Sequence, residues 1–273
     1  MQQGDLTVVY DDGQVTLLCG DVRRVDLPGG SAAAVVTSPP YNVGVAYDGV
    51  SDVLAWPEYW QLAYRAAEVM AGVLVPGGRA WVNTAVSVPW TVAQDGEAEG
   101  PGKSRVMLAH GWHRELSDAG LSVVDQVAWC SPRGAGTAWG SWASPAAPNL
   151  RGDWEAINVA CRGGWERTPP AGYEGWRDGV GAWPALCSTV WQIAPARRDG
   201  HPAPFPIELA RRCIRLSTWQ GEVVFDPFAG SGTTLLAARQ LGRRAIGIEA
   251  SATYCEQIVR RLAQGELPLD GAA

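Results

Sequence analysis

The feature that most constrains the fold is a glycine-rich turn that follows an apolar strand near the C-terminus. Residues 223–225 form a short apolar run, Asp226 comes next, and the turn contains Gly230-Ser231-Gly232. A helical segment follows, and a second apolar run, residues 245–248, ends at Glu249. A strand, a glycine turn, a helix and a strand with a terminal acid form one nucleotide-binding half of a doubly wound sheet. In such a sheet, the acid lies where it can bind the ribose hydroxyls of the nucleotide.

The turn differs from two other nucleotide-binding loops. No Gly-Lys pair precedes Thr233 or Thr234, so the turn lacks the lysine with which a P-loop binds phosphates. It also lacks the G-x-G-x-x-G spacing of dinucleotide-binding enzymes. We therefore do not expect this turn to cradle phosphate groups.

The rest of the chain alternates between predicted strands and helices, as a doubly wound, mostly parallel α/β sheet requires. Apolar residues recur at helical spacing from about Trp56 to Leu74, and Pro76-Gly77-Gly78 is expected to end that helix. With 273 residues, of which 47% are hydrophobic, the chain can bury the core of one domain carrying an insertion. The other predicted strands are residues 6–10, 15–19, 32–37, 80–83, 122–129, 153–161 and 190–193, and the other predicted helices are 105–119, 207–217 and 252–262.

Two proline-containing segments stand out between these elements. The predicted strand 32–37 ends in Ser38-Pro39-Pro40-Tyr41. Adjacent prolines prevent a helix and interrupt the hydrogen-bond ladder of a sheet, so this tetrapeptide must form a loop at the carboxyl end of the strand. The second segment, His201-Pro202-Ala203-Pro204-Phe205-Pro206, precedes the predicted helix 207–217.

Three motifs together resemble those of the beta class of DNA amino-methyltransferases: Asp226–Thr234, Ser38–Tyr41 and His201–Pro206. The tetrapeptide precedes the glycine turn along the chain, as it does in that class. The likeness covers roughly residues 15–85 and 187–262. It implies a Rossmann-like fold of the class I methyltransferase type, S-adenosyl-L-methionine as cofactor and double-stranded DNA as substrate.

The resemblance also implies roles for individual residues. Asp226 matches an acid near the methionine amino group, Glu249 matches the acid that binds the ribose, and Asp21 matches an acid near the adenine ring. The alternatives are an ordinary turn for Asp21 and a proline-rich connector for residues 201–206. The residues expected to contact the cofactor are Asp21, His201, Pro202, Phe205, Asp226, Pro227, Phe228, Ala229, Gly230, Ser231, Gly232, Thr233, Thr234 and Glu249.

The tetrapeptide also suits methylation of a base amine on chemical grounds. The lone pair of an exocyclic amine is delocalised into the ring, so a catalyst must favour the pyramidal nitrogen of the transition state. The Ser38 hydroxyl and a main-chain carbonyl of Pro39-Pro40 can accept the amino hydrogens. Tyr41 would stack on a base flipped out of the duplex, and no cysteine nucleophile is needed. We therefore predict that Ser38, Pro39, Pro40 and Tyr41 are catalytic.

Ser38 bears on the choice of base. Many adenine-modifying relatives carry Asp or Asn at this position, and serine resembles the cytosine-modifying members. A neutral hydroxyl is compatible with cytosine, whose ring nitrogen beside the amine is an acceptor that would repel a carboxylate. We expect methylation of cytosine N4, with adenine N6 as the first alternative. Methylation of RNA or of a protein amide, and a catalytically idle DNA-binding module, are further alternatives.

The middle of the chain is rich in Gly, Pro, Ser and Trp. We expect residues 129–186 to form a target-recognition insertion between a catalytic half, residues 1–128, and a cofactor-binding half, residues 187–273; a hydrophobic cluster under long loops is the alternative reading of its tryptophans. The net charge is −6, but residues 129–217 hold ten arginines against seven acids, and phosphate contact requires only a local basic face. The arginines expected to contact DNA are Arg133, Arg151, Arg162, Arg197 and Arg198.

Composition narrows the setting of the protein. There is no run of about 18 apolar residues and no signal-peptide pattern, so we expect a cytoplasmic, nucleoid-associated protein without a membrane partner. The six cysteines are spaced singly and lack histidines at zinc spacing, so we expect reduced thiols and no metal. The sequence leaves open the recognition site, a cognate restriction endonuclease and a homodimer.

Overall fold

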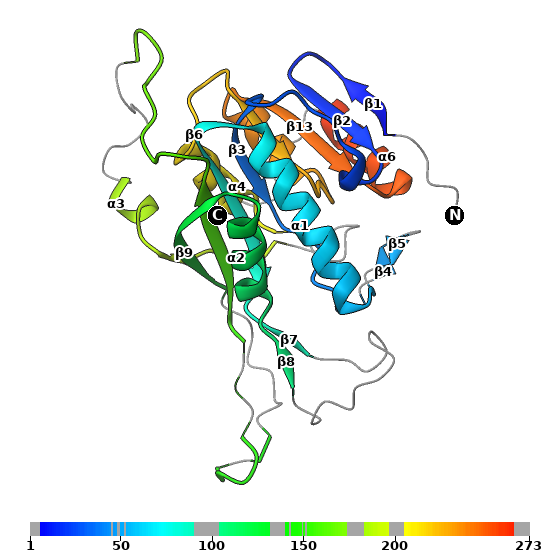
Figure 1. Ribbon diagram of the computed structural model, residues 1–273, viewed down its shortest axis with the longest axis vertical. Helices are drawn as coiled ribbons and strands as arrows, with labels where there is room; N and C mark the ends of the chain where they lie inside the picture. The colour runs from blue at the N-terminus through cyan, green and yellow to red at the C-terminus, as the bar shows by residue number, and fades with distance from the viewer. Residues whose placement is uncertain are drawn as a thin grey trace.

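The computed structural model describes residues 6–44, 46–47, 50–51, 53–89, 104–131, 140–141, 143–148, 150, 152–173, 183–196 and 205–264. Within these residues one sheet contains nine strands in the order β1-β2-β13-β12-β3-β6-β10-β9-β11 (Figure 1). They are β1 (Thr7–Asp11), β2 (Val15–Cys19), β3 (Ala32–Thr37), β6 (Leu74–Ala85), β9 (Ser122–Cys130), β10 (Trp154–Cys161), β11 (Val190–Gln192), β12 (Val223–Asp226) and β13 (Arg244–Glu249).

The direction of the strands confirms a mostly parallel, doubly wound sheet. β1 runs antiparallel to β2, and β10 runs antiparallel to both β6 and β9. The remaining pairs, β2 with β13, β13 with β12, β12 with β3, β3 with β6, and β9 with β11, are parallel. Two short hairpins lie outside this sheet: β4 (Ala46–Tyr47) with β5 (Val50–Ser51), and β7 (Val88–Pro89) with β8 (Arg105–Val106).

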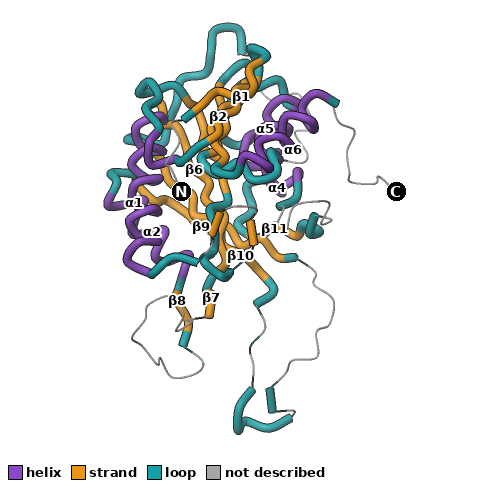
Figure 2. The backbone as a smooth tube through the Cα atoms, turned by 90° about the vertical axis from the view of Figure 1, so that its right-hand side faces the viewer, coloured by secondary structure: helices purple, strands orange, loops and turns teal. Residues whose placement is uncertain are grey.

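Helices cover both faces of the sheet (Figure 2). On one face lie α1 (Trp56–Val73), α2 (Leu108–Asp118) and the short 3-10 helix η1 (Val22–Arg24); on the other lie α4 (Ile207–Arg215), α5 (Thr233–Gln240) and α6 (Ala252–Ala263). A one-turn helix, α3 (Trp183–Leu186), precedes β11. Coverage on both faces explains why all six residues of β3 are buried and apolar or small.

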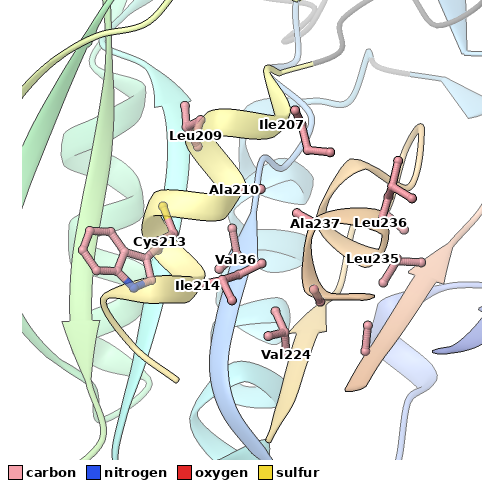
Figure 3. Packing of buried hydrophobic residues seen from close by; sticks show 14 of the residues in the cluster. Val36, Ile207, Leu209, Ala210, Cys213, Ile214, Val224, Leu235, Leu236 and Ala237 are labelled. Atoms are coloured by element: carbon pink, nitrogen blue, oxygen red, sulfur yellow. The ribbon is translucent and has the colours of Figure 1, made fainter. Parts of the chain in front are cut away.

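The core on one face is built by α4 and α5 against the central strands (Figure 3). Ile207, Ala210 and Ile214 recur at helical spacing along α4 and point toward Val36 of β3 and the residues of α5. This packing presses α4 and α5 against β3 and β12, the two strands whose ends carry the predicted site.

The junction of α1 and β6 differs from the sequence prediction. The helix ends at Val73 and the strand begins directly at Leu74, so Pro76-Gly77-Gly78 lies inside the strand. The pairing of β3 with β6 shifts register at this point, which accommodates a proline that cannot donate a hydrogen bond. Gly77 has φ +73°, and a Cβ there would lie 2.5 Å from Cγ of Arg167, so a close chain crossing requires glycine.

The position of β10 corrects the boundaries of the predicted insertion. Residues 154–161 pair with β6 on one side and with β9 on the other, and residues 156–161 are buried. Residues 129–186 therefore do not form a single insertion, because the middle of this range is a core strand. The expectation that the flanking segments recognise the target stays a prediction.

The segment that follows β10 is fastened to the end of the sheet remote from β7 and β8 (Figure 1). The guanidinium of Arg162 donates to the carbonyls of Gly72, at 3.1 Å, and Leu74. Arg79 lies over the ring of Trp165 at 4.0 Å, and Arg167 lies over the ring of Trp219 at 4.5 Å. These arginine and tryptophan side chains hold residues 162–167 against the sheet.

Candidate active site

The predicted site residues gather where parallel strands end at the same edge of the sheet. Ser38–Tyr41 follows β3, Asp226 ends β12 and Glu249 ends β13. β12 and β3 are neighbours, but the chain continues from β12 through α5 to β13 and from β3 through α1 to β6, on opposite sides. Such a switch point at the carboxyl ends of strands is where open α/β sheets bind ligands.

Two hydrogen bonds join the tetrapeptide strand to the glycine turn. The Thr37 hydroxyl donates to Oδ1 of Asp226 at 2.7 Å, and the Thr234 hydroxyl donates to the carbonyl of Val36 at 3.2 Å. Thr37 is the residue directly before Ser38. The tetrapeptide and the glycine turn, the two predicted site motifs, therefore lie side by side in the fold although they are far apart in the sequence.

Asp226 is a fully buried carboxylate at the end of β12. Burial raises its pKa to about 6, and hydrogen bonds from Thr37 and from the Phe228 amide only partly offset this effect. Its Oδ2 is buried and has no hydrogen-bond partner among the described residues. A buried acceptor without a donor fits a cationic ligand group, and the ammonium of S-adenosyl-L-methionine would supply one.

Glu249 presents a second carboxylate at the end of β13. Its Oε2 accepts from the Gly230 amide at 2.8 Å and its Oε1 accepts from the Ser251 amide at 2.9 Å. Burial raises its pKa to about 7 despite these two hydrogen bonds. A carboxylate has about four acceptor positions, so both oxygens can also receive hydroxyl donors such as those of a ribose.

The glycine turn itself is held from behind by α6. Gly232 has φ +76° and precedes α5, and a Cβ there would lie 3.0 Å from Cγ2 of Ile258. Arg261 donates to the Ser231 carbonyl at 2.8 Å, and the Ser231 and Thr233 hydroxyls lie 3.0 Å apart. The turn, residues 227–234 from Pro227 through Phe228, Ala229 and Gly230 to Thr234, is thus a fixed backbone surface beside both carboxylates.

The other residues predicted to bind the cofactor are Asp21, Phe205, His201 and Pro202. Asp21 follows β2 at the same edge of the sheet, since the Gly20 amide donates to the Glu249 carbonyl at 2.8 Å, and its carboxylate is paired with Arg23. Phe205 packs against the core beside α4. His201 and Pro202 lie outside the described residues, so their contact with the cofactor, like that of Asp21, stays a prediction.

The tetrapeptide forms a loop whose polar groups are engaged by three neighbouring elements. Oγ of Ser38 lies 3.2 Å from Oη of Tyr41, and the Tyr41 hydroxyl donates to Oε2 of Glu155 at 2.7 Å. The Pro40 carbonyl accepts from the Tyr59 hydroxyl of α1 at 2.8 Å. Because Pro40 is already engaged, the Pro39 carbonyl is the better candidate acceptor for an amino hydrogen.

Sequence reasoning missed three residues of this loop's surroundings. Asn83 of β6 is 2% exposed and donates to Oε2 of Glu155 at 2.8 Å and to Oη of Tyr41 at 3.0 Å. Asn83 ends the predicted strand 80–83, so a polar residue at a carboxyl edge was the available signal. Glu155 begins an antiparallel strand, and Tyr59 belongs to a helix, so neither carries such a signal without the sheet order.

Most of the predicted DNA-binding arginines, Arg133, Arg151, Arg197 and Arg198, lie outside the described residues. Arg162 is described, and it lies at the opposite end of β10 from Glu155, bonded to main-chain carbonyls. Its position and contacts are those of a structural residue. In contrast, β7, β8 and residues 143–148 project from the end of the sheet where β3 leads into Ser38–Tyr41, as both views show (Figures 1 and 2).

Three further findings concern cysteines, metal sites and membrane-spanning helices in the described part of the chain. All six cysteines are free thiols. Within the described ranges, His, Cys, Asp and Glu side chains form no group of three or more that could hold a metal. No helix among those described has the length and apolar character needed to cross a membrane.

Comparison with known proteins identifies the family of the chain. Residues 32–260 match the model of a family of N6/N4 methyltransferases described as DNA methylase. The type II methyltransferase M.ScaI of Streptomyces caespitosus is 29% identical over 279 residues, covering 93% of this chain and 83% of the relative. The DNA adenine methyltransferase YhdJ of Escherichia coli (strain K12) is 25% identical, covering 90% and 82%.

A solved structure extends the likeness to the cofactor. TTHA0409 of Thermus thermophilus, in complex with S-adenosyl-L-methionine, matches with a TM-score of 0.73 and 27% identity, covering 95% of this chain and 99% of that chain. The TM-score shows that the two chains share the same overall fold. The chain therefore belongs to the N6/N4 DNA methylase family and is an S-adenosyl-L-methionine-dependent DNA amino-methyltransferase.

Proposed function

We propose that the protein methylates N4 of cytosine in double-stranded DNA, acting on a base flipped out of the helix. The observation that carries the proposal is the neutral Ser38 hydroxyl, hydrogen-bonded to Tyr41, in the loop next to Asp226. A neutral hydroxyl can stand beside cytosine, whose N3 is an acceptor, without the repulsion that a carboxylate would meet. Flipping is required because the amine cannot be reached inside the duplex.

The residues of the loop would hold and orient the base. Tyr41 stacks on its face, while Oγ of Ser38 and the Pro39 carbonyl accept the two amino hydrogens. Both acceptors draw the amine toward the pyramidal geometry in which its lone pair points away from the ring, so they act mainly in the transition state. When bound, S-adenosyl-L-methionine would supply an electrophilic methyl group: the carbon–sulfur bond of the sulfonium breaks and leaves a neutral thioether as the carbon–nitrogen bond forms. The methylated amine then releases one proton to solvent water.

The cofactor would be held by the two buried carboxylates and the glycine turn. Asp226 receives the ammonium of the methionine end, and Glu249 receives the ribose hydroxyls. Asp21, His201, Pro202 and Phe205 would complete the site at the adenine and methionine ends. Since Thr37 links Asp226 to the tetrapeptide strand, the methyl donor and the base amine would meet between β12 and β3.

DNA would approach the carboxyl edge of the sheet, where the flipped base must enter. The segments that flank β10 and the hairpin β7–β8 would supply the recognition surface, with Arg133, Arg151, Arg197 and Arg198 as phosphate or guanine contacts. A recognition site of this kind would suit a cytoplasmic restriction-modification system, as in the type II relatives.

Adenine N6 is the second candidate, because YhdJ is named an adenine methyltransferase. To decide, plasmid DNA is methylated by the purified protein, digested to nucleosides and analysed by mass spectrometry, with sequencing of the modified positions. We expect N4-methylcytosine at a defined site. N6-methyladenine would overturn the choice of base, and modification of RNA but not duplex DNA would overturn the proposed substrate.

A further inference from the structure

The tetrapeptide is connected to a carboxylate that no catalytic motif contains. Glu155 lies on β10, two strands from β3, and its Oε2 receives both the Tyr41 hydroxyl, at 2.7 Å, and the Asn83 amide, at 2.8 Å. Tyr41 in turn lies 3.2 Å from Ser38 Oγ. A chain of hydrogen bonds thus runs from Ser38 through Tyr41 to Glu155.

The donors and acceptors available to these side chains determine which partner donates in each hydrogen bond. A carboxylate only accepts hydrogen bonds, so the single proton of the Tyr41 hydroxyl must point to Glu155. Tyr41 then has only lone pairs to offer Ser38, so in that contact the Ser38 hydroxyl must be the donor. Of the two lone pairs on Oγ of Ser38, one faces Nδ2 of Asn83 at 3.5 Å, and the other is left for the substrate.

Asn83 reinforces the same direction. Its Nδ2 donates to Tyr41 Oη at 3.0 Å as well as to Glu155. Turning the amide round would place its oxygen against the Glu155 carboxylate, two acceptors in contact, so the observed orientation is the only favourable one. Nδ2 also faces Oγ of Ser38 at 3.5 Å, again as a donor, so all three contacts of this amide agree with the direction from Ser38 to Glu155.

We propose that Glu155 is a positioning residue that acts through Tyr41 to make Ser38 a hydrogen-bond acceptor toward the target amine. Hydrogen bonds in a chain polarise one another, so the anionic end also strengthens Ser38 as an acceptor. The inference rests on the proposed function of the loop. It has a consequence for selectivity: Ser38 accepts from an amine but has no proton for a ring carbonyl in the same place.

The test uses the Glu155→Gln variant of the full-length protein, with a duplex carrying the site found by sequencing. An amide keeps the size of the side chain but can turn its NH2 toward Tyr41 and reverse the chain. We expect the single-turnover methylation rate to fall roughly tenfold to a hundredfold. The affinity for S-adenosyl-L-methionine, measured by calorimetry, should stay within about twofold because Glu155 lies on β10, three strands from β12, whose end carries Asp226.

A second readout separates this role from a merely structural one. Binding is compared for duplexes in which the target base carries an amine or a carbonyl: cytosine against uracil, or adenine against hypoxanthine if adenine is the target. The wild type should bind the duplex with the amine more tightly than the duplex with the carbonyl. In Glu155→Gln this difference in affinity should be smaller, because Ser38 can then donate to the carbonyl. Tyr41→Phe, which keeps the ring but breaks the chain, should narrow it to the same extent, and the double variant should lose no more than either single variant.

The control is Glu166→Gln, the same change at an exposed position at the other end of the sheet, which should alter neither rate nor preference. A normal rate for Glu155→Gln, or a lower rate with an unchanged preference for the amine, would overturn the inference. Failure of the wild-type protein to methylate DNA would instead overturn the proposed function, so the two outcomes are distinct.

Discussion

At the scale of single residues, substitution should separate the two proposed roles: base binding by the tetrapeptide and cofactor binding by the carboxylates of Asp226 and Glu249. Ser38→Ala removes an acceptor for the amine and leaves Asp226 and Glu249 intact. We expect single-turnover methylation to fall by about 10²-fold, comparable to the loss of one oxyanion-type contact. Calorimetry should find the cofactor affinity unchanged. A variant that methylates at the normal rate would remove Ser38 from the mechanism.

Asp226 makes stability depend on pH in a direction unusual for an acid. Its folded-state pKa is raised to about 6, above the unfolded value of 3.8, so its contribution to stability is fully present below about pH 4 and is lost as pH rises through 6. The size of the change is on the order of 3 kcal/mol, because the group is fully buried. Glu249 acts in the same direction as pH rises through about 7.

The matching experiment follows thermal unfolding from pH 5 to pH 8 with and without S-adenosyl-L-methionine. Without the cofactor, Asp226→Asn should gain stability relative to the wild type as pH rises, because the amide carries no buried charge. With the cofactor, the wild type should gain more stability at pH 8 than at pH 5, because an ionised Asp226 attracts the ammonium. Equal gains at both pH values, in wild type and variant alike, would show that Asp226 is not the ammonium partner.

The sequence predicts those residues of this site that lie at the ends of apolar strands, but not those that act through contacts between strands. Asp226, Glu249 and Ser38 all follow strands that are short apolar runs, and their places at one edge follow from parallel pairing alone. Glu155 and Asn83 act through side-chain contacts across β6 and β10, which depend on a sheet order that no local pattern encodes. Gly77 misled the prediction because a glycine beside a proline is typical of a helix end, yet here it permits a chain crossing inside a strand.

At the scale of elements, the close contact of α1 with α2 supports the catalytic loop. A Cβ at Gly111 of α2 would lie 2.1 Å from the Trp60 ring of α1. At the neighbouring position, Trp112 Nε1 donates to the Tyr59 hydroxyl at 2.9 Å, and Tyr59 donates to the Pro40 carbonyl. The distance between the helices therefore sets the position of Tyr59 under the tetrapeptide.

Two helical glycines allow this coupling to be tested. Gly111→Ala should force α1 and α2 apart, lower the free energy of unfolding by roughly 1–3 kcal/mol and reduce methylation at temperatures where the protein is still folded. Gly72→Ala, on α1 with no atom within 4 Å of its added Cβ, should instead stabilise by up to about 1 kcal/mol with normal activity. Urea unfolding and single-turnover rates measure both. A similar response from the two variants would mean that the helix contact has no specific role.

At the scale of the whole molecule, the predicted active site and the arginines that stabilise the fold lie at opposite ends of the sheet. Ser38, Asp226 and Glu249 share the carboxyl edge, while Arg162, Arg79 and Arg167 fasten the chain at the other end. Counting charges along the chain predicted that residues 129–217 supply a local basic face for DNA. Such a count does not report which end of a strand a residue occupies. β10 reverses the direction of the chain and carries Arg162 away from the site.

This separation predicts opposite results for two sets of arginine substitutions. Arg162→Ala removes hydrogen bonds to the carbonyls of Gly72 and Leu74 and should lower the free energy of unfolding by roughly 1–3 kcal/mol, with unchanged affinity for duplex DNA. Replacing Arg197 and Arg198 by alanine should weaken DNA binding and reduce the slope of log K against log salt by up to about 2, since each phosphate contact contributes nearly one unit. Urea unfolding measures the stability, and fluorescence anisotropy at several salt concentrations measures the affinity for DNA and its dependence on salt. If Arg162→Ala reduced that slope while Arg197 and Arg198 proved neutral, DNA would have to bind at the other end of the sheet, away from Ser38.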